Sequence, residues 1–384
     1  MMAKTERAQF VDRMRGLAML VMIEVHVTNS LLLPALRETA WFPLLNFING
    51  LVAPSFLFIS GLAFGLAAGK KLDEFRRYGA TFWLQLGRIG LIALLGFLLH
   101  LPYFSLRLTL KNWRWIHWNY FFSFDILHCI AAGLLFLFAA RLLIRSDRGY
   151  GRFLIGGAAI ALLAAPFAWQ VDWWRIAPAP LAGALSPARP ALFPLLPWLA
   201  FLFFGGIVSE RFRLAKSAGA DAERRHFRRL ALLAAALIVL GRVFLLSALN
   251  FQQYIAPIRP NWVFFGYRLG WVLALLCLCR WLDDVKRGRL PWVVAAGRES
   301  LLVYVAHLMI LYRHVFGLPN VVEWVGRRLD LGQALLGSLA LAAAMVVLAI
   351  GWGRIKRRDR RLARRITALA FAAFLVLFVL ARSA

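Results

Sequence analysis

The feature that most constrains this chain is a series of apolar stretches, each long enough to cross a membrane as a helix. A helix needs roughly 17 to 25 apolar residues to cross about 30 Å of hydrocarbon. With 61% hydrophobic and only 17% charged residues, the 384-residue chain is too apolar for an ordinary soluble domain. We therefore expect an all-α polytopic transmembrane helix bundle that forms a single domain over residues 1–384. The eleven predicted spans are 14–35, 44–68, 86–104, 119–143, 152–169, 191–210, 229–248, 262–282, 293–312, 330–353 and 366–382.

The charge distribution decides between two classes of basic protein. A net charge of +28 would suggest nucleic-acid binding in a soluble domain. The 46 Lys and Arg residues lie mostly between the apolar stretches, however, and they concentrate in alternate connections. By the positive-inside rule this pattern predicts a cytoplasmic N-terminus. We expect the lipid bilayer as a partner and no nucleic acid.

The first span carries two ionisable side chains, Glu24 and His26. An ionisable residue inside the hydrocarbon region is costly and usually faces a protein or water-filled interior, where it serves function. His26 lies eleven residues beyond Arg15, or about 16 Å along the helix, close to the midplane. Glu24 points to nearly the opposite side, so the two side chains do not share one narrow site. The alternative is a polar knot that holds helices together.

Three later spans place titratable groups in the same half of the membrane. Asp125 and His128 are three residues apart and share a helix face, where a carboxylate can orient an imidazole. His100 and His307 lie at similar depths. If these helices converge, they form a polar cavity that opens outward. For His100, as for Arg242 and Arg268, the alternative is a structural ion pair or snorkelling to the interface.

A resemblance to a known family rests on five motifs that follow one another along the chain. They are FVDRMRGLAMLVMIEVH, LVAPSFLFISGLAFGLAAGK, SFDILHCIAAGLL, PWLAFLFFGG and GRESLLVYVAHLMILY. In this order they resemble the catalytic-domain family of heparan-alpha-glucosaminide N-acetyltransferase, and the resemblance is strongest over residues 10 to 70. It implies an acyltransferase that moves an acyl group, commonly acetyl, from a cytoplasmic coenzyme A thioester to a sugar or glycan acceptor on the far side. Because the resemblance is to bacterial members of the family, it also implies the bacterial inner membrane as the location.

The resemblance also assigns roles to residues. It carries over Asp12, Arg15 and Gly16 as the opening motif and His26 as the catalytic base. Our hypothesis is that His26 deprotonates the acceptor, that Asp125 and His128 bind or orient it, and that His307 lines the same cavity. Asp12, Arg13 and Arg15 would lie near the phosphates of the acyl-CoA donor. We expect no permanently bound cofactor and no metal, with acetyl-CoA or another acyl-CoA as co-substrate.

Two other classes of function remain open at this stage. The same intramembrane groups suit the proton relay of a transporter or of a lipid or glycan flippase. Such machines usually show repeat symmetry and discontinuous helices, neither of which is evident in the sequence. A non-catalytic scaffold would leave the buried titratable groups without purpose. The basic segment RIKRRDRRLARR attracts either an anionic donor or anionic lipids.

Overall fold

The structure is a computed structural model of the chain. It describes residues 8–381 apart from 70, 102, 113, 187, 189–191, 247–259, 286–289 and 314–319. The regular elements of this described part are helices, and its β pairing is limited to one isolated bridge, between Leu32 and Leu329. The described residues divide into two compact units, each of which is described below by itself. The single-domain prediction stays a prediction.

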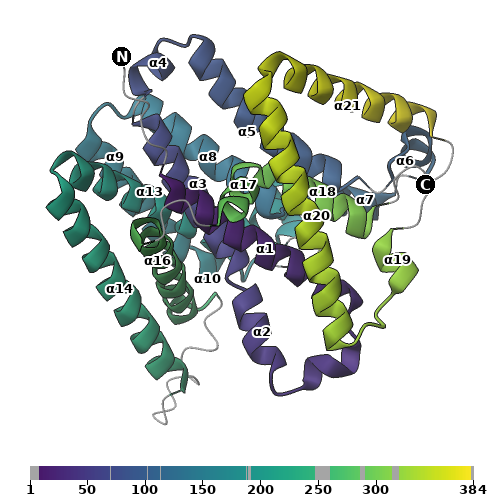
Figure 1. Cartoon of the computed structure of the whole chain (residues 1–384), viewed down its shortest axis with the longest axis horizontal. Helices are drawn as coiled ribbons and strands as arrows, with labels where there is room; N and C mark the ends of the chain where they lie inside the picture. The colour runs from purple at the N-terminus through teal and green to yellow at the C-terminus, as the bar shows by residue number, and fades with distance from the viewer. Residues whose placement is uncertain are drawn as a thin grey trace. The chain divides into compact units, whose positions relative to one another are not determined.

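The first unit comprises residues 1–52, 101–114 and 279–384. Its central helix, α1, packs against α17, α18 and α20, and α20 in turn contacts α21 (Figure 1). The bridge beside Leu32 fastens the end of α1 to the segment before α20. The helices of this unit are α1 (Gln9–Leu31), η1 (Pro34–Glu38), α2 (Phe42–Asn49), α6 (Leu106–Asn112), α17 (Pro291–Arg298), α18 (Ser300–Tyr312), α19 (Val321–Val325), α20 (Leu331–Arg358) and α21 (Arg360–Leu380).

The second unit comprises residues 53–100 and 115–278. In it α13 packs against α8, α9 and α14, and α5 packs against α8. Its helices are α3 (Val52–Ala68), α4 (Leu72–Arg76), α5 (Ala80–Leu99), α7 (Trp115–Phe121), α8 (Ile126–Leu143), α9 (Asp147–Leu163), α10 (Ala165–Ala168), α11 (Trp173–Ile176), α12 (Ala179–Leu185), α13 (Leu195–Ser217), α14 (Ala220–Leu246) and most of α16 (Trp262–Val285).

In each unit two helices cross closely at a point where each of them contributes a glycine. In the first unit, a Cβ on Gly16 of α1 would lie 2.0 Å from the carbonyl oxygen of Val293, and one on Gly297 of α17 would lie 1.8 Å from that of Asp12. In the second unit, the same holds for Gly61 of α3 and Gly205 of α13, each 1.9 Å from a backbone oxygen of the other helix. Small residues let membrane helices approach this closely. The Arg-Gly motif thus places Gly16 at a helix crossing.

The helices long and apolar enough to cross a membrane confirm the all-α membrane bundle. Eight such spans occur among the described residues: Phe42–Ala68, Ala80–Leu99, Ile126–Leu143, Asp147–Ala168, Leu195–Ser217, Trp262–Val285, Leu331–Arg358 and Arg360–Leu380. Helices α17 and α18 taken together are also long and apolar enough for one span, but the pair is bent by 82°. Helices α1 and α14 match two more predicted spans. Both begin with charged residues, and neither is among the eight spans. The count of eleven and the cytoplasmic N-terminus stay predictions.

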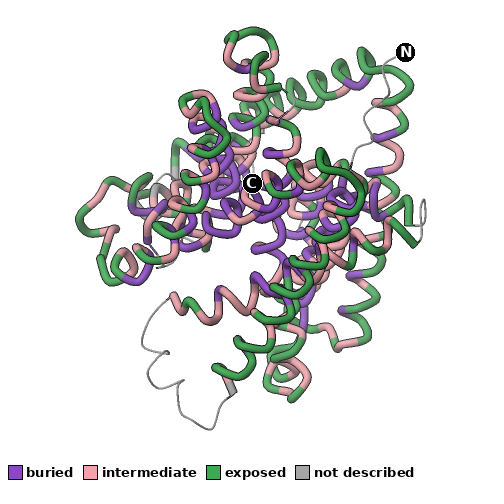
Figure 2. Tube along the Cα trace, turned by 90° about the vertical axis from the view of Figure 1, so that its left-hand side faces the viewer, coloured by how far each residue is buried: buried purple, intermediate pink, exposed green. Residues whose placement is uncertain are grey.

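Apolar exposure on the outer helices has the pattern of a lipid-facing surface. Leu336, Leu339 and Val347 of α20 and Leu369 of α21 each expose 67–69% of their surface. Figure 2 shows helical turns of this exposed kind in green along the trace, beside helices whose buried residues are purple. Soluble proteins rarely expose contiguous apolar patches of this extent, whereas hydrocarbon solvates them. These exposed apolar side chains, on helices long enough to cross a membrane, indicate an integral membrane protein.

Candidate active site

His26 is placed by α1, the central helix of the first unit. Ser30 lies four residues further along, so the two side chains share a face of the helix. That face meets α18, which carries His307 and ends at Tyr312. The rings of His26 and His307 have centroids 5.3 Å apart, and those of His26 and Tyr312 are 5.6 Å apart. The structure therefore brings together two of the predicted catalytic residues, His26 and His307.

The hydroxyl of Tyr312 is the centre of a small hydrogen-bond network. It lies 3.1 Å from Nδ1 of His26 and 2.6 Å from the hydroxyl of Ser30, and it also contacts the carbonyl oxygen of His26 at 3.3 Å. These contacts hold one nitrogen of the His26 ring. The other nitrogen, Nε2, has no hydrogen-bond partner among the described residues, and it is not fully buried. His26 thus presents Nε2 to an approaching group.

His307 is fully buried, and its hydrogen bond fixes its tautomer. Its Nδ1 lies 2.8 Å from the carbonyl oxygen of Val303, one turn earlier in α18. A carbonyl oxygen only accepts, so Nδ1 carries the proton and Nε2 holds the lone pair. Nε2 has no partner among the described residues. An unprotonated imidazole nitrogen is therefore buried close to His26.

An apolar cluster supports the two helices beside this site. Val27, Leu31 and Leu311 are each 1–3% exposed and pack with Tyr312, Val321, Val322, Val325, Leu329 and Leu341. Such packing fixes rotamers and keeps water from one side of the site. The described residues include no group of three His, Cys, Asp or Glu side chains placed to hold a metal ion.

The second unit holds a different cluster, formed by His100, Asp125 and His128. Asp125 is the N-cap of α8: its Oδ1 accepts hydrogen bonds from the amides of Leu127 and His128 at 2.9 and 3.1 Å. Nδ1 of His128 lies 2.8 Å from the same oxygen, and Nε2 of His100 lies 3.8 Å from Oδ2. The rings of His100 and His128 are stacked with centroids 5.3 Å apart.

This second cluster is densely filled. The ring of His128 contacts Phe97 and Phe124, with centroids 4.4 and 5.4 Å away. A Cβ on Gly96 would lie 2.9 Å from Nε2 of His128, so α5 closes directly over the nitrogen that faces away from Asp125. The geometry is that of a helix cap with a packed aromatic cover. Asp125 and His128 are thus together, as predicted, but in another unit than His26, and a shared cavity stays a prediction.

The two remaining cationic candidates, Arg242 and Arg268, belong to neither cluster. The guanidinium of Arg268 lies 4.1 Å from the centre of the Phe264 ring, and Arg242 is exposed. Their surroundings agree with the alternative of structural contacts or snorkelling.

The predicted donor-binding residues of the opening motif are engaged in contacts within the first unit. Asp12 is 2% exposed at its side chain and forms ion pairs with Arg15 at 3.6 Å and with Arg298 at 3.2 Å. Arg13 is 1% exposed, pairs with Asp283 and donates to the carbonyl oxygen of Cys279. These contacts join α1 to α17 and to the end of α16. Donor binding by Asp12, Arg13 and Arg15 stays a prediction.

The sequence analysis missed two members of the His26 network, Ser30 and Tyr312. Ser30 carried a usable signal, because it is four residues from His26 on an amphipathic face. Tyr312 carried a weaker one, because its position depends on the bend between α17 and α18. At that bend Arg298 pairs with Asp12 of α1, and Glu299 pairs with Lys356 of α20 at 2.6 Å. Two adjacent residues of opposite charge thus hold the broken span against two different helices.

Comparison with known proteins agrees with the resemblance seen in the sequence. The profile described as heparan-alpha-glucosaminide N-acetyltransferase, catalytic, matches residues 7–253. This range includes His26 and the His100, Asp125 and His128 cluster; His307 and Tyr312 lie beyond it. The comparison with curated proteins gave no match. Because the profile covers more than half of the 384 residues, the chain belongs to the heparan-alpha-glucosaminide N-acetyltransferase catalytic family.

Proposed function

We propose that this membrane protein of an acetyltransferase family transfers an acyl group, acetyl in the first instance, from a coenzyme A thioester to a hydroxyl or amine of a sugar or glycan. The observation that carries the proposal is the state of His26. Tyr312 holds its Nδ1, and Nε2 is left open. A histidine held by one nitrogen and open at the other is arranged as a general base.

The chemical step follows from that arrangement. Nε2 of His26 takes the proton of the acceptor hydroxyl or amine as its oxygen or nitrogen attacks the thioester carbonyl. A new C–O or C–N bond forms, the C–S bond breaks, and the leaving thiolate takes the proton back from His26. His307, whose ring centroid lies 5.3 Å from that of His26, helps to position the His26 ring for this step. A positioned base of this kind contributes roughly 10²- to 10⁴-fold to the rate.

The direction of transfer follows the predicted topology. The donor approaches from the cytoplasmic side, where the N-terminal motif and the basic segments lie in that topology. The acceptor approaches from the outer side, and a bacterial envelope glycan at the inner membrane is the acceptor class that we propose.

One observation favours a second candidate, a proton-coupled transporter or flippase. The bent pair α17 and α18 is a broken span with an 82° angle, and broken helices are a common feature of transporter sites. The bend, at Glu299, lies eight residues before His307, a group that could carry a proton. Transport would move a substrate without forming an acylated product.

The test uses the full chain in proteoliposomes with labelled acetyl-CoA and a panel of amino sugars and neutral sugars. We expect a labelled acylated product from the natural sequence. The His26→Ala variant should lose at least about a hundredfold in kcat, with an unchanged melting temperature. Near-normal product formation by His26→Ala would remove the mechanism. Uptake of sugar or lipid without any acylated product would favour the transporter.

A further inference from the structure

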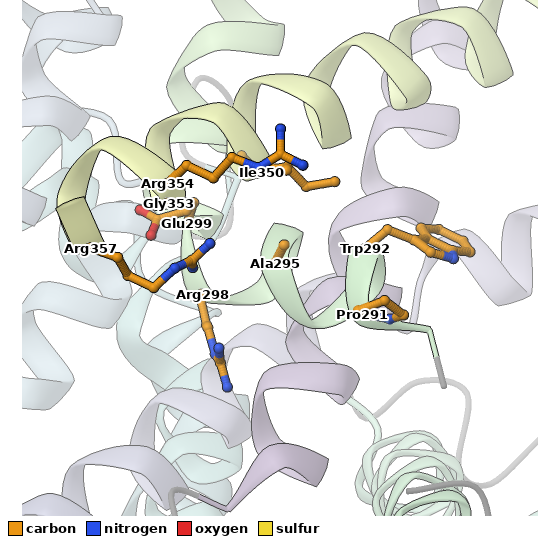
Figure 3. Close-up of a pocket in the computed structure, with 10 residues that line it drawn as sticks. Pro291, Trp292, Ala295, Arg298, Glu299, Ile350, Gly353, Arg354 and Arg357 are labelled. Carbon is orange, nitrogen blue, oxygen red and sulfur yellow. The ribbon is translucent and has the colours of Figure 1, made fainter. Parts of the chain in front are cut away.

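A pocket of about 410 Å³ opens between α17 and α20 in the first unit, apart from the His26 network. Trp292, Ala295 and Arg298 line it from α17, and Arg354 and Arg357 line it from α20. In Figure 3, Arg298, Glu299 and Arg357 lie toward one end, and Pro291 with Trp292 lies at the other. The pocket therefore combines a cationic end with an aromatic end.

The cationic end has more positive than negative charge. Asp12 pairs with Arg298, and Glu299 pairs with Lys356. Arg354 and Arg357 are exposed, and neither has an ion pair or hydrogen bond among the described residues. Two positive charges are thus left uncompensated in a concave site. Guanidinium groups in this state suit phosphate oxygens, which they bind with charge-assisted hydrogen bonds.

A glycine provides room for one of these guanidinium groups. A Cβ on Gly353, one turn before Arg357, would lie 3.3 Å from Nη1 of Arg357. A larger residue at this position would require the exposed Arg357 side chain to shift by a few tenths of an ångström. Gly353 thus leaves the Arg357 guanidinium free to lie against α20.

The pocket lies beside the start of α1, and His26 lies further along the same helix. Arg298 lies beside Asp12 at 3.2 Å, and His26 is fourteen residues further along the same helix, or about 21 Å. An extended phosphopantetheine arm bridges a distance of that order. The first unit thus holds a cationic pocket at one end of α1 and an imidazole base toward the other.

We infer that the pocket between α17 and α20 is a phosphate-binding site, in which Arg354 and Arg357 bind the phosphate groups of an anionic ligand and Trp292 packs against its remainder. Two sources share this chemistry: the nucleotide end of coenzyme A, and the headgroup of an anionic phospholipid. The geometry relative to His26 favours the nucleotide, and that assignment rests on the proposed function; the phosphate site itself does not.

The test measures binding to the full chain in phosphatidylcholine nanodiscs, with coenzyme A and adenosine 3′,5′-bisphosphate as probes. The double variant Arg354→Gln/Arg357→Gln should weaken coenzyme A binding about tenfold or more, because two charge-assisted hydrogen-bonding groups are lost. The control Arg358→Gln/Arg361→Gln removes the same charge from the same segment outside the pocket, and it should bind within about twofold of the natural sequence. Ala295→Phe, which fills the pocket without changing its charge, should weaken binding as the double variant does.

A second arm identifies the source of the phosphate. In nanodiscs that mix phosphatidylglycerol with phosphatidylcholine, the amount of phosphatidylglycerol retained on purification is compared between the same variants. Loss of coenzyme A binding in Arg354→Gln/Arg357→Gln supports the nucleotide. Unchanged coenzyme A binding with selective loss of phosphatidylglycerol supports the lipid headgroup. If the pocket variants and the control behave alike for both ligands, the phosphate site is overturned. The phosphate site and the proposed function fail separately. If His26→Ala binds coenzyme A normally but forms no product, the proposed function stands even where the pocket variants overturn the phosphate site.

Discussion

The two histidine clusters of this protein have the same spacing and different surroundings. His26 and His307 in the first unit, and His100 and His128 in the second, each have ring centroids 5.3 Å apart. In the second unit a carboxylate contacts a nitrogen of each ring and caps a helix, and Gly96 of α5 closes over His128. In the first unit the partner is a phenol, and one nitrogen of His26 is open.

The difference shows that a histidine beside a carboxylate does not by itself indicate a catalytic site, because the same pair can cap a helix. Asp125 uses its oxygen to satisfy the amides at the start of α8, which would otherwise be unpaired in an apolar interior. His26 has no helix end to satisfy, because it lies inside α1, five residues before its last residue. It is half-buried, its ring contacts Tyr312 through Nδ1, and its Nε2 is open, which favours a chemical task.

The largest effect that we expect concerns the two close helix crossings, one in each unit. Gly16→Ala in the first unit and Gly61→Ala in the second would each force a Cβ to about 2 Å from a backbone oxygen. Overpacking against backbone should cost about 3 kcal/mol in the free energy of unfolding, the upper part of the usual range. Thermal melts should show both variants far below Gly90→Ala, whose Cβ would meet open space. Equal melting temperatures for all three would contradict the close crossings.

The next effect separates capping from catalysis in the second unit. Asp125→Ala removes the N-cap of α8 and should lower the free energy of unfolding by about 0.5 to 2 kcal/mol. Asp125→Asn keeps an N-cap residue and should recover most of that loss, although the charge is gone. If Asp125 instead acts on the substrate, Asp125→Asn will be stable but inactive. Melting curves and acyl transfer rates, measured on the same preparations, distinguish the two.

A smaller effect should follow from removing the phenol hydroxyl in the first unit. Tyr312→Phe keeps the ring beside His26 but loses the hydrogen bond to Nδ1. One neutral hydrogen bond is worth about 1 kcal/mol, or roughly fivefold in rate. We expect the loss in kcat with KM unchanged, since Tyr312 positions the base and does not bind the acceptor. Ser30→Ala should show a weaker effect of the same kind, and a rise in KM alone would contradict the positioning role.

The smallest effect involves a histidine outside both clusters, His226, in the charged first part of α14 ahead of its apolar stretch. Burial lowers the pKa of His226 below its ordinary value, and Arg211 and Arg229 lower it further against the opposing effect of Glu223. The unfolded chain therefore binds the proton more readily, and stability should fall as the pH drops below about 6.5. His226→Gln should flatten this part of the melting temperature profile. An identical pH profile for the variant would exclude His226 as its source.

The sequence was sufficient to predict the membrane class, because the length and apolarity of the spans are direct consequences of bilayer thickness. It also singled out His26 and His307. It did not separate the two histidine clusters into two units, because depth along a span says nothing about which helices pack together. Asp125 and His128 at three-residue spacing fit a catalytic pair and a capping box equally well, and only the start of α8 at Ile126 distinguishes them.

The donor residues show the same limit for charged groups. Arg13 and Arg15 are prominent in the sequence, yet the structure engages Arg13 with Asp283 and Arg15 with Asp12. Arg354 and Arg357 lie in a basic segment whose composition also fits topology and lipid contact. Which arginine is compensated depends on tertiary partners far away in the chain, and sequence spacing does not supply these.

The measurement that tests the account most directly compares His26→Gln with His128→Gln in one acyl transfer assay, at equal amounts of folded protein. Glutamine at position 128 still fits a capping box, and glutamine at position 26 cannot act as a base. We predict that His26→Gln loses at least about a hundredfold in kcat while it binds coenzyme A normally, and that His128→Gln stays within about threefold of the natural sequence. Equal losses in both variants, or an active His26→Gln, would contradict it.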